Sequence, residues 1–445
     1  MSIFKACDIR GVYPQELDEA TAEAVGRAVG TELEGAACVV GGDARPSTPA
    51  LKDAICRGLA AAGAQVTDIG TVPTPVVYWA RRRLGSRGAV VVTASHNPPQ
   101  YNGIKFMLGD LPVTEEDMGR VRRRLETGER PHRPPRPPST RSVRADYLAF
   151  LAERFAGTGA GLRVLVDAGN GVAGDWAPQA FRAAGYTVDE LFCRVDGTFP
   201  DRSPNPSRPQ AVAAASASMA AHAGMRARSA DFAACFDGDA DRVVFLDEHG
   251  LFVPAEDAII LFARDILPAR PGGVVYDLKC TRMVPREIER FGGRPIMERS
   301  GHAFIKRRLI TEGAVFAGEV SGHFYFEELA GDDGIYAALR MGEILASRPV
   351  SLSELRFTIA PYFISEDIRI PAPGGDGRQV VQRLMERFAD RPQDHTDGVR
   401  IEFDGGWALC RPSVTEPVVT LRVEGDSPQR LDEIRRLVLE SIPEG

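Results

Sequence analysis

The sequence has no long apolar run, no Cys-x-x-Cys pair and no excess of positive charge. No stretch is long enough to cross a membrane, and residues 1–11 lack the apolar core of a secretory signal. The seven cysteines are scattered and odd in number, which is typical of reduced thiols rather than of a disulfide framework. These absences predict a cytoplasmic protein without a membrane partner.

Aromatic residues are missing from the one strongly basic part of the chain, residues 120–141. Nucleic-acid binding usually combines positive charge with aromatic side chains on which bases stack. The formal net charge is −7, and residues 130–140 are dense in proline, which predicts a stiff, exposed linker. We therefore expect no nucleic-acid partner.

The chain is too long for a single hydrophobic core. A length of 445 residues predicts three or four domains, and the proline-rich linker marks the first boundary. Strand and helix patterns alternate through much of the sequence, which is typical of α/β domains with helices on both faces of a sheet. We place the four domains at residues 1–143, 144–246, 247–361 and 362–445.

The clearest buried strand is the apolar run at residues 90–93, and Ser95 follows at its end. Pro98 breaks the chain there, so Ser95 is presented on a loop beyond the strand's carboxyl end. Such a serine could be a nucleophile, a phosphate carrier or an ordinary turn residue. The adjacent His96 does not decide among these, because a Ser-His pair alone is no triad and Gly-x-Ser-x-Gly is absent.

Three aspartates, Asp237, Asp239 and Asp241, alternate in a loop directly after another apolar strand. Their mutual repulsion favours a bound cation, and carboxylate oxygens suit Mg²⁺ or Ca²⁺. A calcium-binding EF-hand is a weaker interpretation, because Arg242 stands where that loop requires glycine. A solvated turn is the third interpretation, and the metal site is the one the pattern favours.

Basic side chains stand at several other strand ends, mostly beside glycine or serine. Such donors suit an anionic ligand, and arginine in particular suits phosphate. The residues are Arg10, Arg45, Lys105, Lys279, His302, His323 and Arg411.

Four of the loops resemble, in sequence and in order, those of the α-D-phosphohexomutase family. They are TASHNP at residues 93–98, DGDADR at 237–242, GEVSGH at 318–323 and RPSVTEP at 411–417. The resemblance spans essentially the whole chain. Within the family, the chain is most similar to the bacterial phosphomannomutase/phosphoglucomutase branch.

This resemblance implies an α/β fold with four domains around a central cleft. The first three domains would be α/β/α units with mixed sheets, and the fourth a smaller α+β domain. In chain order they would carry a phosphoserine loop, a metal-binding loop, a sugar-recognition loop and a phosphate-binding loop.

The resemblance also implies a role for each site residue. Ser95 would carry a phosphoryl group, one oxygen of which would join Asp237, Asp239 and Asp241 in holding Mg²⁺. His96 would support the phosphoserine, and Arg10, Lys105 and His323 would be acid/base candidates. The substrate-binding residues would be Arg242, Lys279, His302, Glu319, Ser321, Arg411, Ser413 and Thr415.

The implied activity is the Mg²⁺-dependent interconversion of hexose 1-phosphate and hexose 6-phosphate, with mannose and/or glucose as the sugar. A hexose 1,6-bisphosphate would be the intermediate and activator, and we expect a monomer or weak dimer.

Two alternatives keep the same scaffold. One is a phosphoglucosamine mutase, and the other is a non-catalytic phosphosugar-binding protein. The second draws on Cys7 and Val414, where the family often has an aromatic residue and asparagine.

Overall fold

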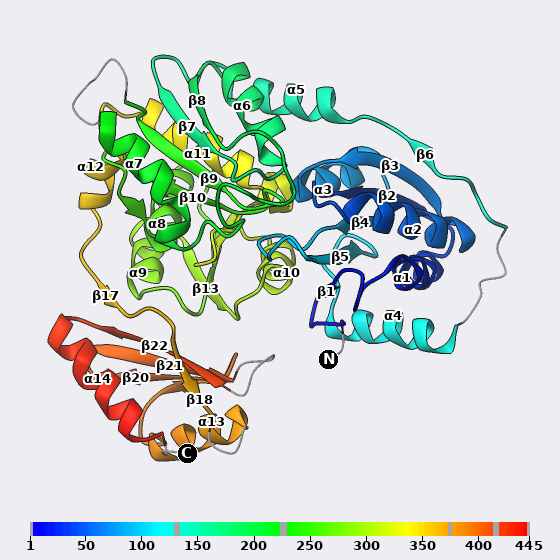
Figure 1. Cartoon of the computed structure of the whole chain (residues 1–445). Coiled ribbons are helices and arrows are strands. Elements are labelled where there is room, and N and C mark those ends of the chain that lie inside the picture. The colour runs from blue at the N-terminus through cyan, green and yellow to red at the C-terminus, as the bar shows by residue number, and fades with distance from the viewer. Residues whose placement is uncertain (1–2, 129–133, 223–228, 373–375, 413–417, 443–445) are drawn as a thin grey trace.

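The computed structural model of the chain describes residues 3–128, 134–222, 229–372, 376–412 and 418–442. Four β-sheets follow one another along the chain, each with its own helices (Figure 1). In the described residues, no helix is both long enough and apolar enough to cross a membrane.

The first sheet has the strand order β1-β5-β4-β2-β3-β6. Strands β4, β2, β3 and β6 are parallel neighbours, and β5 runs antiparallel to β1 and β4. The strands are β1 (Ile9–Val12), β2 (Ala37–Gly42), β3 (Gln65–Thr71), β4 (Gly88–Val92), β5 (Tyr101–Met107) and β6 (Ser139–Thr140). The helices are α1 (Glu19–Glu32), α2 (Thr48–Ala61), α3 (Thr74–Arg83) and α4 (Glu115–Thr127).

Strand β4 is buried along its whole length because helices cover both faces of this sheet. Val90 and Val92 pack with α1, α2 and α4, whereas Val91 packs with α3 on the other face. This explains why an uninterrupted apolar run, rather than an alternating one, precedes Ser95.

The second sheet has the order β11-β10-β9-β7-β8, and its β9–β10 hairpin carries the aspartate loop. Its strands are β7 (Arg163–Asp167), β8 (Thr187–Leu191), β9 (Phe232–Phe236), β10 (Val243–Leu246) and β11 (Phe252–Val253). The helical segments are α5 (Arg144–Arg154), α6 (Ala173–Ala183), the 3-10 turn Pro209–Val212 and α7 (Ala213–His222).

The third sheet has the order β13-β12-β14-β15-β16 and is also mixed. Its strands are β12 (Gly273–Asp277), β13 (Arg294–Glu298), β14 (Phe316–Gly318), β15 (Phe324–Phe326) and β16 (Gly331–Asp332). The helical segments are α8 (Ala255–Ile266), α9 (Met283–Arg290), α10 (His302–Glu312), the 3-10 turn Glu327–Leu329, α11 (Gly334–Ala346) and α12 (Leu352–Phe357).

The fourth sheet is antiparallel, with the order β17-β22-β21-β20-β19 and β18 also paired to β22. Its strands are β17 (Phe363–Ile364), β18 (Ile368–Pro371), β19 (Gln393–Asp394), β20 (Val399–Phe403), β21 (Gly406–Pro412) and β22 (Val418–Gly425). Helices α13 (Gly377–Arg387) and α14 (Pro428–Glu440) share one apolar cluster with this sheet. The predicted fold class, three mixed α/β units followed by a smaller α+β unit, is confirmed.

Two details differ from the sequence-based picture. Ser139 and Thr140, in the proline-rich linker, form β6 on the edge of the first sheet, so this part of the linker is not simply an exposed spacer. The second sheet continues past residue 246 to Val253. The domain boundaries themselves stay a prediction.

The first three sheets share a core. Helix α11, which follows the third sheet, packs on α6, β9 and β10 of the second. Tyr147 of α5 donates a hydrogen bond to Asp333 Oδ2 at 2.6 Å, and Asp333 also caps α11. One apolar cluster therefore runs through residues of all three units.

The fourth unit contacts the third through Trp407, which is completely buried. Its ring packs with Leu278 and Leu409 and lies 4.0 Å from Arg400 Cζ, and its Nε1 donates to Glu424 Oε2 at 2.6 Å. Arg400 also donates to the carbonyl oxygen of Leu278 at 2.8 Å. Side chains along β21 point alternately to its two faces, so Ala408 and Cys410, on the other face, pack in the fourth unit's own core.

We expect Trp407→Ala to destabilise the fourth unit by about 3–5 kcal/mol, because it leaves a large cavity and removes one of the hydrogen-bond donors to Glu424. Differential scanning calorimetry should show this loss of stability as a transition at lower temperature for part of the molecule. Phe357→Ala is the matched control, since that ring is 87% exposed. Equal transition temperatures for the two variants would contradict this account of the interface.

Candidate active site

Ser95 lies three residues beyond β4, where the first sheet meets the second. Its side chain is completely buried, and its Oγ donates to Asp237 Oδ2 at 2.7 Å and lies 3.3 Å from His96 Nδ1. The backbone of Ser95 is left-handed, with φ of 51°, which costs a serine about 1–2 kcal/mol. A buried, strained serine held against a carboxylate is a feature of functional sites rather than of ordinary turns.

The aspartate loop approaches Ser95 closely because Gly238 has no side chain. A Cβ on Gly238 would lie 2.6 Å from the carbonyl oxygen of Ser95. Ala240 adopts φ of 60°, which turns the loop back toward β10. The two loops thus interlock, although they belong to different sheets.

The three aspartates are buried and meet at one point. One carboxylate oxygen from each lies within 4.8 Å of the others. Asp239 Oδ1 and Asp241 Oδ1 are buried without a hydrogen-bond partner among the described residues. Unpartnered buried oxygens are costly without a cation, so the donor set fits the predicted Mg²⁺.

Lys105 of β5 neutralises part of this charge. Its Nζ bonds Asp239 Oδ2 at 3.1 Å and Asp241 Oδ2 at 2.5 Å. Burial opposes the ammonium charge, but the two aspartates outweigh it and raise the pKa of Lys105 well above its usual value. Lys105 is therefore held protonated.

The three aspartates do not share the positive charge equally. Burial, followed by repulsion from Asp241 and Asp239, raises the pKa of Asp237 well above its usual value. For Asp241, Lys105 and His323 outweigh burial and lower the pKa. Of these two carboxyl groups, Asp237, which touches Ser95, thus gains more from an added cation than Asp241 does.

Two arginines border the cluster. Arg242 Nε lies 3.8 Å from Asp237 Oδ2 and 3.9 Å from Asp241 Oδ1, outside hydrogen-bond distance. Arg10 is held by Asp8 at 2.7 Å and by Asn97 Oδ1 at 2.8 Å, so it contacts the serine loop directly. Positive charge from Arg242 and then burial lower the pKa of His96 well below its usual value, so His96 is neutral.

The third sheet contributes Glu319, Ser321 and His323 from the turn between β14 and β15. His323 Nδ1 lies 2.9 Å from Ser321 Oγ, and its Nε2 lies 3.3 Å from Asp241 Oδ1. The Tyr325 hydroxyl donates to Glu319, and burial raises the pKa of this carboxyl group. His323 therefore links the turn after β14 to the aspartate loop.

The predicted phosphate-binding residues are more dispersed. Lys279 Nζ is paired with Asp367 Oδ2 at 2.5 Å, between strands β17 and β18 of the fourth sheet. Arg411 is paired with Asp397, and its Nη1 lies 3.5 Å from Ser300 Oγ. Ser413 and Thr415 lie outside the described residues.

Three further residues complete the site, although none of them was predicted as a site residue. Thr74 donates to Asp239 Oδ2 at 2.6 Å, and Thr93 Oγ1 lies 3.2 Å from the same oxygen. Asp332 lies 3.9 Å from His323 Nε2. Thr74 begins α3 after a proline, and nothing local distinguishes it from a helix-start residue. The Asp332–Asp333 pair was a visible signal, because adjacent aspartates at a strand end often have buried partners.

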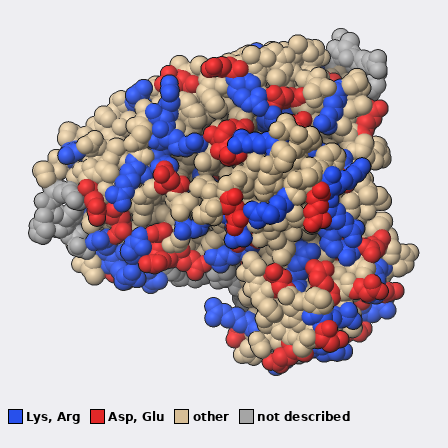
Figure 2. Space-filling model, turned by 180° about the vertical axis from the view of Figure 1, so that it is seen from behind, with Lys and Arg blue, Asp and Glu red and all other residues tan. Residues whose placement is uncertain are grey.

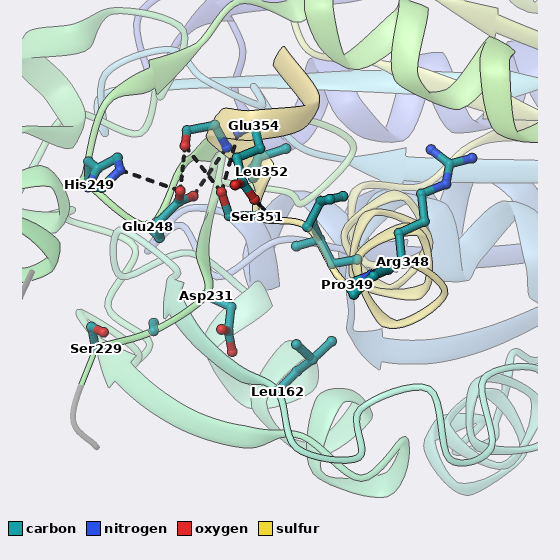
Figure 3. Close-up of a pocket in the computed structure, with 14 residues that line it drawn as sticks. Leu162, Ser229, Asp231, Glu248, His249, Arg348, Pro349, Ser351, Leu352 and Glu354 are labelled. Atoms are coloured by element: carbon teal, nitrogen blue, oxygen red, sulfur yellow. Dashed lines mark hydrogen bonds and ion pairs between the residues drawn. The ribbon is translucent and has the colours of Figure 1, made fainter. Parts of the chain in front are cut away.

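A hollow of about 630 Å³ lies elsewhere, between the second sheet and α12 (Figure 3). Among its lining residues, Glu248 accepts from the backbone and side chain of Ser353. None of the residues in the predicted site lines it. On the face seen in Figure 2, basic and acidic side chains are interspersed, so this face carries no single sign of charge.

The whole chain is similar in sequence to proteins of one known family. Models of the phosphoglucomutase/phosphomannomutase family match four successive parts of the chain. They are α/β/α domain I at residues 1–132, domain II at 145–250, domain III at 255–362 and the C-terminal domain at 372–441. The chain belongs to this family.

Individual relatives cover nearly the whole chain. A phosphomannomutase/phosphoglucomutase of Pseudomonas aeruginosa is 38% identical over 98% of this chain and 94% of the relative. A phosphoglucomutase of Neisseria gonorrhoeae is 35% identical over 99% and 97%. The crystal structure of a family protein from Burkholderia thailandensis matches with a TM-score of 0.91, at 34% identity, over 100% and 98% of the two chains. The prediction of a phosphohexomutase-class isomerase is confirmed.

The site makes a prediction about acid stability. Burial and the nearby Lys105 lower the pKa of His302 to about 3, below its ordinary value of 6.5. The unfolded chain therefore binds the extra proton first, so this contribution to stability is complete above pH 6.5 and is lost as the pH falls toward 3. His302→Gln should flatten this part of the curve of unfolding free energy against pH.

Urea unfolding at pH 4, 5, 6 and 7 measures the effect. His249→Gln is the control, because that histidine is largely exposed beside the hollow of Figure 3. A wild-type curve parallel to that of His302→Gln would show that His302 is not held neutral.

Proposed function

We propose that this chain interconverts hexose 1-phosphates and hexose 6-phosphates through a phosphoserine at position 95. The observation that carries the proposal is the 2.7 Å contact between Ser95 Oγ and Asp237, within a buried set of carboxylates that has unpartnered oxygens. A hydroxyl group placed in this way can carry a phosphoryl group whose charge a cation balances.

In the first step the bond between phosphorus and Ser95 Oγ breaks while a bond to a sugar hydroxyl oxygen forms. The sugar hydroxyl proton passes to a base, and Ser95 Oγ takes up a proton and becomes the hydroxyl that donates to Asp237. The product is a hexose 1,6-bisphosphate. Turned around in the site, it returns its other phosphoryl group to Ser95.

Mg²⁺ would be held by Asp237, Asp239 and Asp241 together with a phosphoserine oxygen, and would neutralise charge on the transferred group. Thr74 and Lys105 hold the acidic loop from outside. Since Lys105 stays protonated, we assign it charge stabilisation or proton donation, and we assign proton removal to His323. Arg10 holds the serine loop and offers a second positive charge to the phosphoryl group.

Substrate binding would draw on the third and fourth units. Glu319 and Ser321 would bind the sugar hydroxyls, because their oxygens lie beside His323 at the turn after β14. Arg411, Ser413 and Thr415 would bind the phosphate that is not transferred, with Arg242, Lys279 and His302 adding contacts. His96, neutral and with its Nδ1 3.3 Å from Ser95 Oγ, would support the phosphoserine.

Relatives named for both mannose and glucose support a mannose and/or glucose phosphate as substrate. Turnover of mannose 1-phosphate, glucose 1-phosphate and glucosamine 1-phosphate under matched conditions tests this choice. A preference for the amino sugar would overturn it. A cytoplasmic location and a monomeric or weakly dimeric state stay predictions from the sequence.

Ser95→Ala should reduce mutase activity to background, because it removes the oxygen that carries the phosphoryl group. Intact-protein and peptide mass spectrometry of the wild type, after incubation with glucose 1,6-bisphosphate, should place one phosphate on Ser95. Ser347→Ala, at the end of α11, is the control and should behave as the wild type. An active Ser95→Ala enzyme, or phosphate on another residue, would refute the proposal.

Lys105→Met should destabilise the metal-free protein by about 3–5 kcal/mol, because it leaves buried carboxylates without their cation. Added Mg²⁺ should then raise the unfolding temperature more in this variant than in the wild type, since metal binding to the folded state relieves the added repulsion. Lys52→Met, which removes the partly exposed pair with Asp68, is the control. An equal Mg²⁺ shift in all three proteins would contradict metal binding at this loop.

A further inference from the structure

Arg45 lies beneath the serine loop and bonds only to the protein. Its side chain is completely buried, and its Nε is paired with Asp43 Oδ2 at 3.0 Å. Nη2 donates to the carbonyl oxygens of Ser95 and Asn97 at 2.7 and 2.6 Å. Nη1 donates to the carbonyl oxygens of Pro98 and Tyr101 at 2.7 and 3.0 Å. Every N–H of the guanidinium group is therefore in use.

Asp43 fixes the arginine to the end of β2 and to the start of the loop. Its carboxylate accepts from Thr48 Oγ1 and from Thr93 Oγ1, each at 2.7 Å, and from the Arg45 backbone N–H at 3.0 Å. Thr93 Oγ1 in turn accepts from the backbone N–H of Ser95 at 2.8 Å. The loop is thus held through its carbonyl oxygens and through the backbone N–H of Ser95.

This arrangement has an electrostatic effect on a phosphorylated serine. A phosphoserine carries close to two negative charges, and carbonyl oxygens that faced it would repel it. Arg45 binds four carbonyl oxygens of the loop from below, so they face the guanidinium group. The left-handed backbone of Ser95 persists only where its surroundings determine it, and the bond from Nη2 to the Ser95 carbonyl supplies such a constraint.

The second unit also contacts the residues after β2, Ala44 and Arg45. Its Cζ lies 5.1 Å from the centre of the Phe199 ring, and a Cβ on Gly197 would come within 2.0 Å of the Ala44 carbonyl oxygen. The arginine is therefore fixed from the first sheet by Asp43 and from the second unit by Phe199.

We propose that Arg45 is a positioning residue for phosphoryl transfer: it holds residues 95–101 in the single conformation that aligns Ser95 with the aspartate loop. The inference rests on the proposed role of Ser95 as phosphoryl carrier. Arg45 touches no reacting atom, so its loss should slow the transfer and leave substrate affinity almost unchanged.

Arg45→Lys keeps the charge but lacks the planar fork of donors that reaches four carbonyl oxygens. We expect kcat to fall by about 10²-fold, the effect of misplacing a reacting group by about 1 Å, while KM stays close to the wild-type value. The single-turnover rate from isolated phosphoenzyme to glucose 1-phosphate should fall by the same factor. Arg264→Lys is the matched control, because this buried arginine bonds Glu287 and Thr358 away from the site.

A loss of kcat no greater than in Arg264→Lys, or a loss that lies in KM, would overturn the inference. If Arg45→Lys does not fold, hydrogen exchange of the wild type decides. The amides of Ser95, Asn97 and Tyr101 should exchange slowly both with and without phosphate on Ser95, and fast exchange in the unphosphorylated protein would overturn the inference. Wild-type protein without phosphate on Ser95, together with an active Ser95→Ala variant, would instead refute the proposed function.

Discussion

Three carboxylates share one small buried space with a single ammonium group, and the arrangement of the first three units depends on this constraint. Asp237, Asp239 and Asp241 repel one another, and Arg242 of their own loop comes no closer than 3.8 Å, so groups outside the loop must help to balance their charge. Lys105 comes from the first sheet with its ammonium group 2.5 Å from Asp241, and His323 comes from the third sheet with its Nε2 3.3 Å from the same residue. Three sheets therefore meet at one point because no single one of them can balance the charge there.

Local patterns explain why much of the fold was predictable. The apolar run before Ser95 and the apolar strand before Asp237 are both buried strands, and each functional loop follows its strand directly. Helix α1 begins after Asp18, whose side chain accepts from the Thr21 N–H. Such signals depend on neighbours in the sequence, which is why patterns in a single chain reveal them.

The rest of the site depends on contacts between distant residues. Thr74 bonds Asp239 across 165 positions, and Arg45 bonds the Asn97 carbonyl across 52. The sequence around Arg45 suggests only a donor for an anionic ligand at a strand end, and charged side chains are rarely buried without a partner. Burial became possible because Asp43 and four carbonyl oxygens satisfy the guanidinium group, and this arrangement exists only once β4 and β5 lie beside β2.

The position of α11 has a consequence for how the chain is made. The second sheet is formed from residues before 254, but the helix that covers one of its faces spans Gly334–Ala346. The Tyr147–Asp333 hydrogen bond likewise joins residues 186 positions apart. Synthesis proceeds at about 5–20 residues per second. That apolar face is therefore exposed for several seconds before α11 has been synthesised. In that interval the nascent second unit exposes apolar surface to other chains, and a chaperone would find its substrate there.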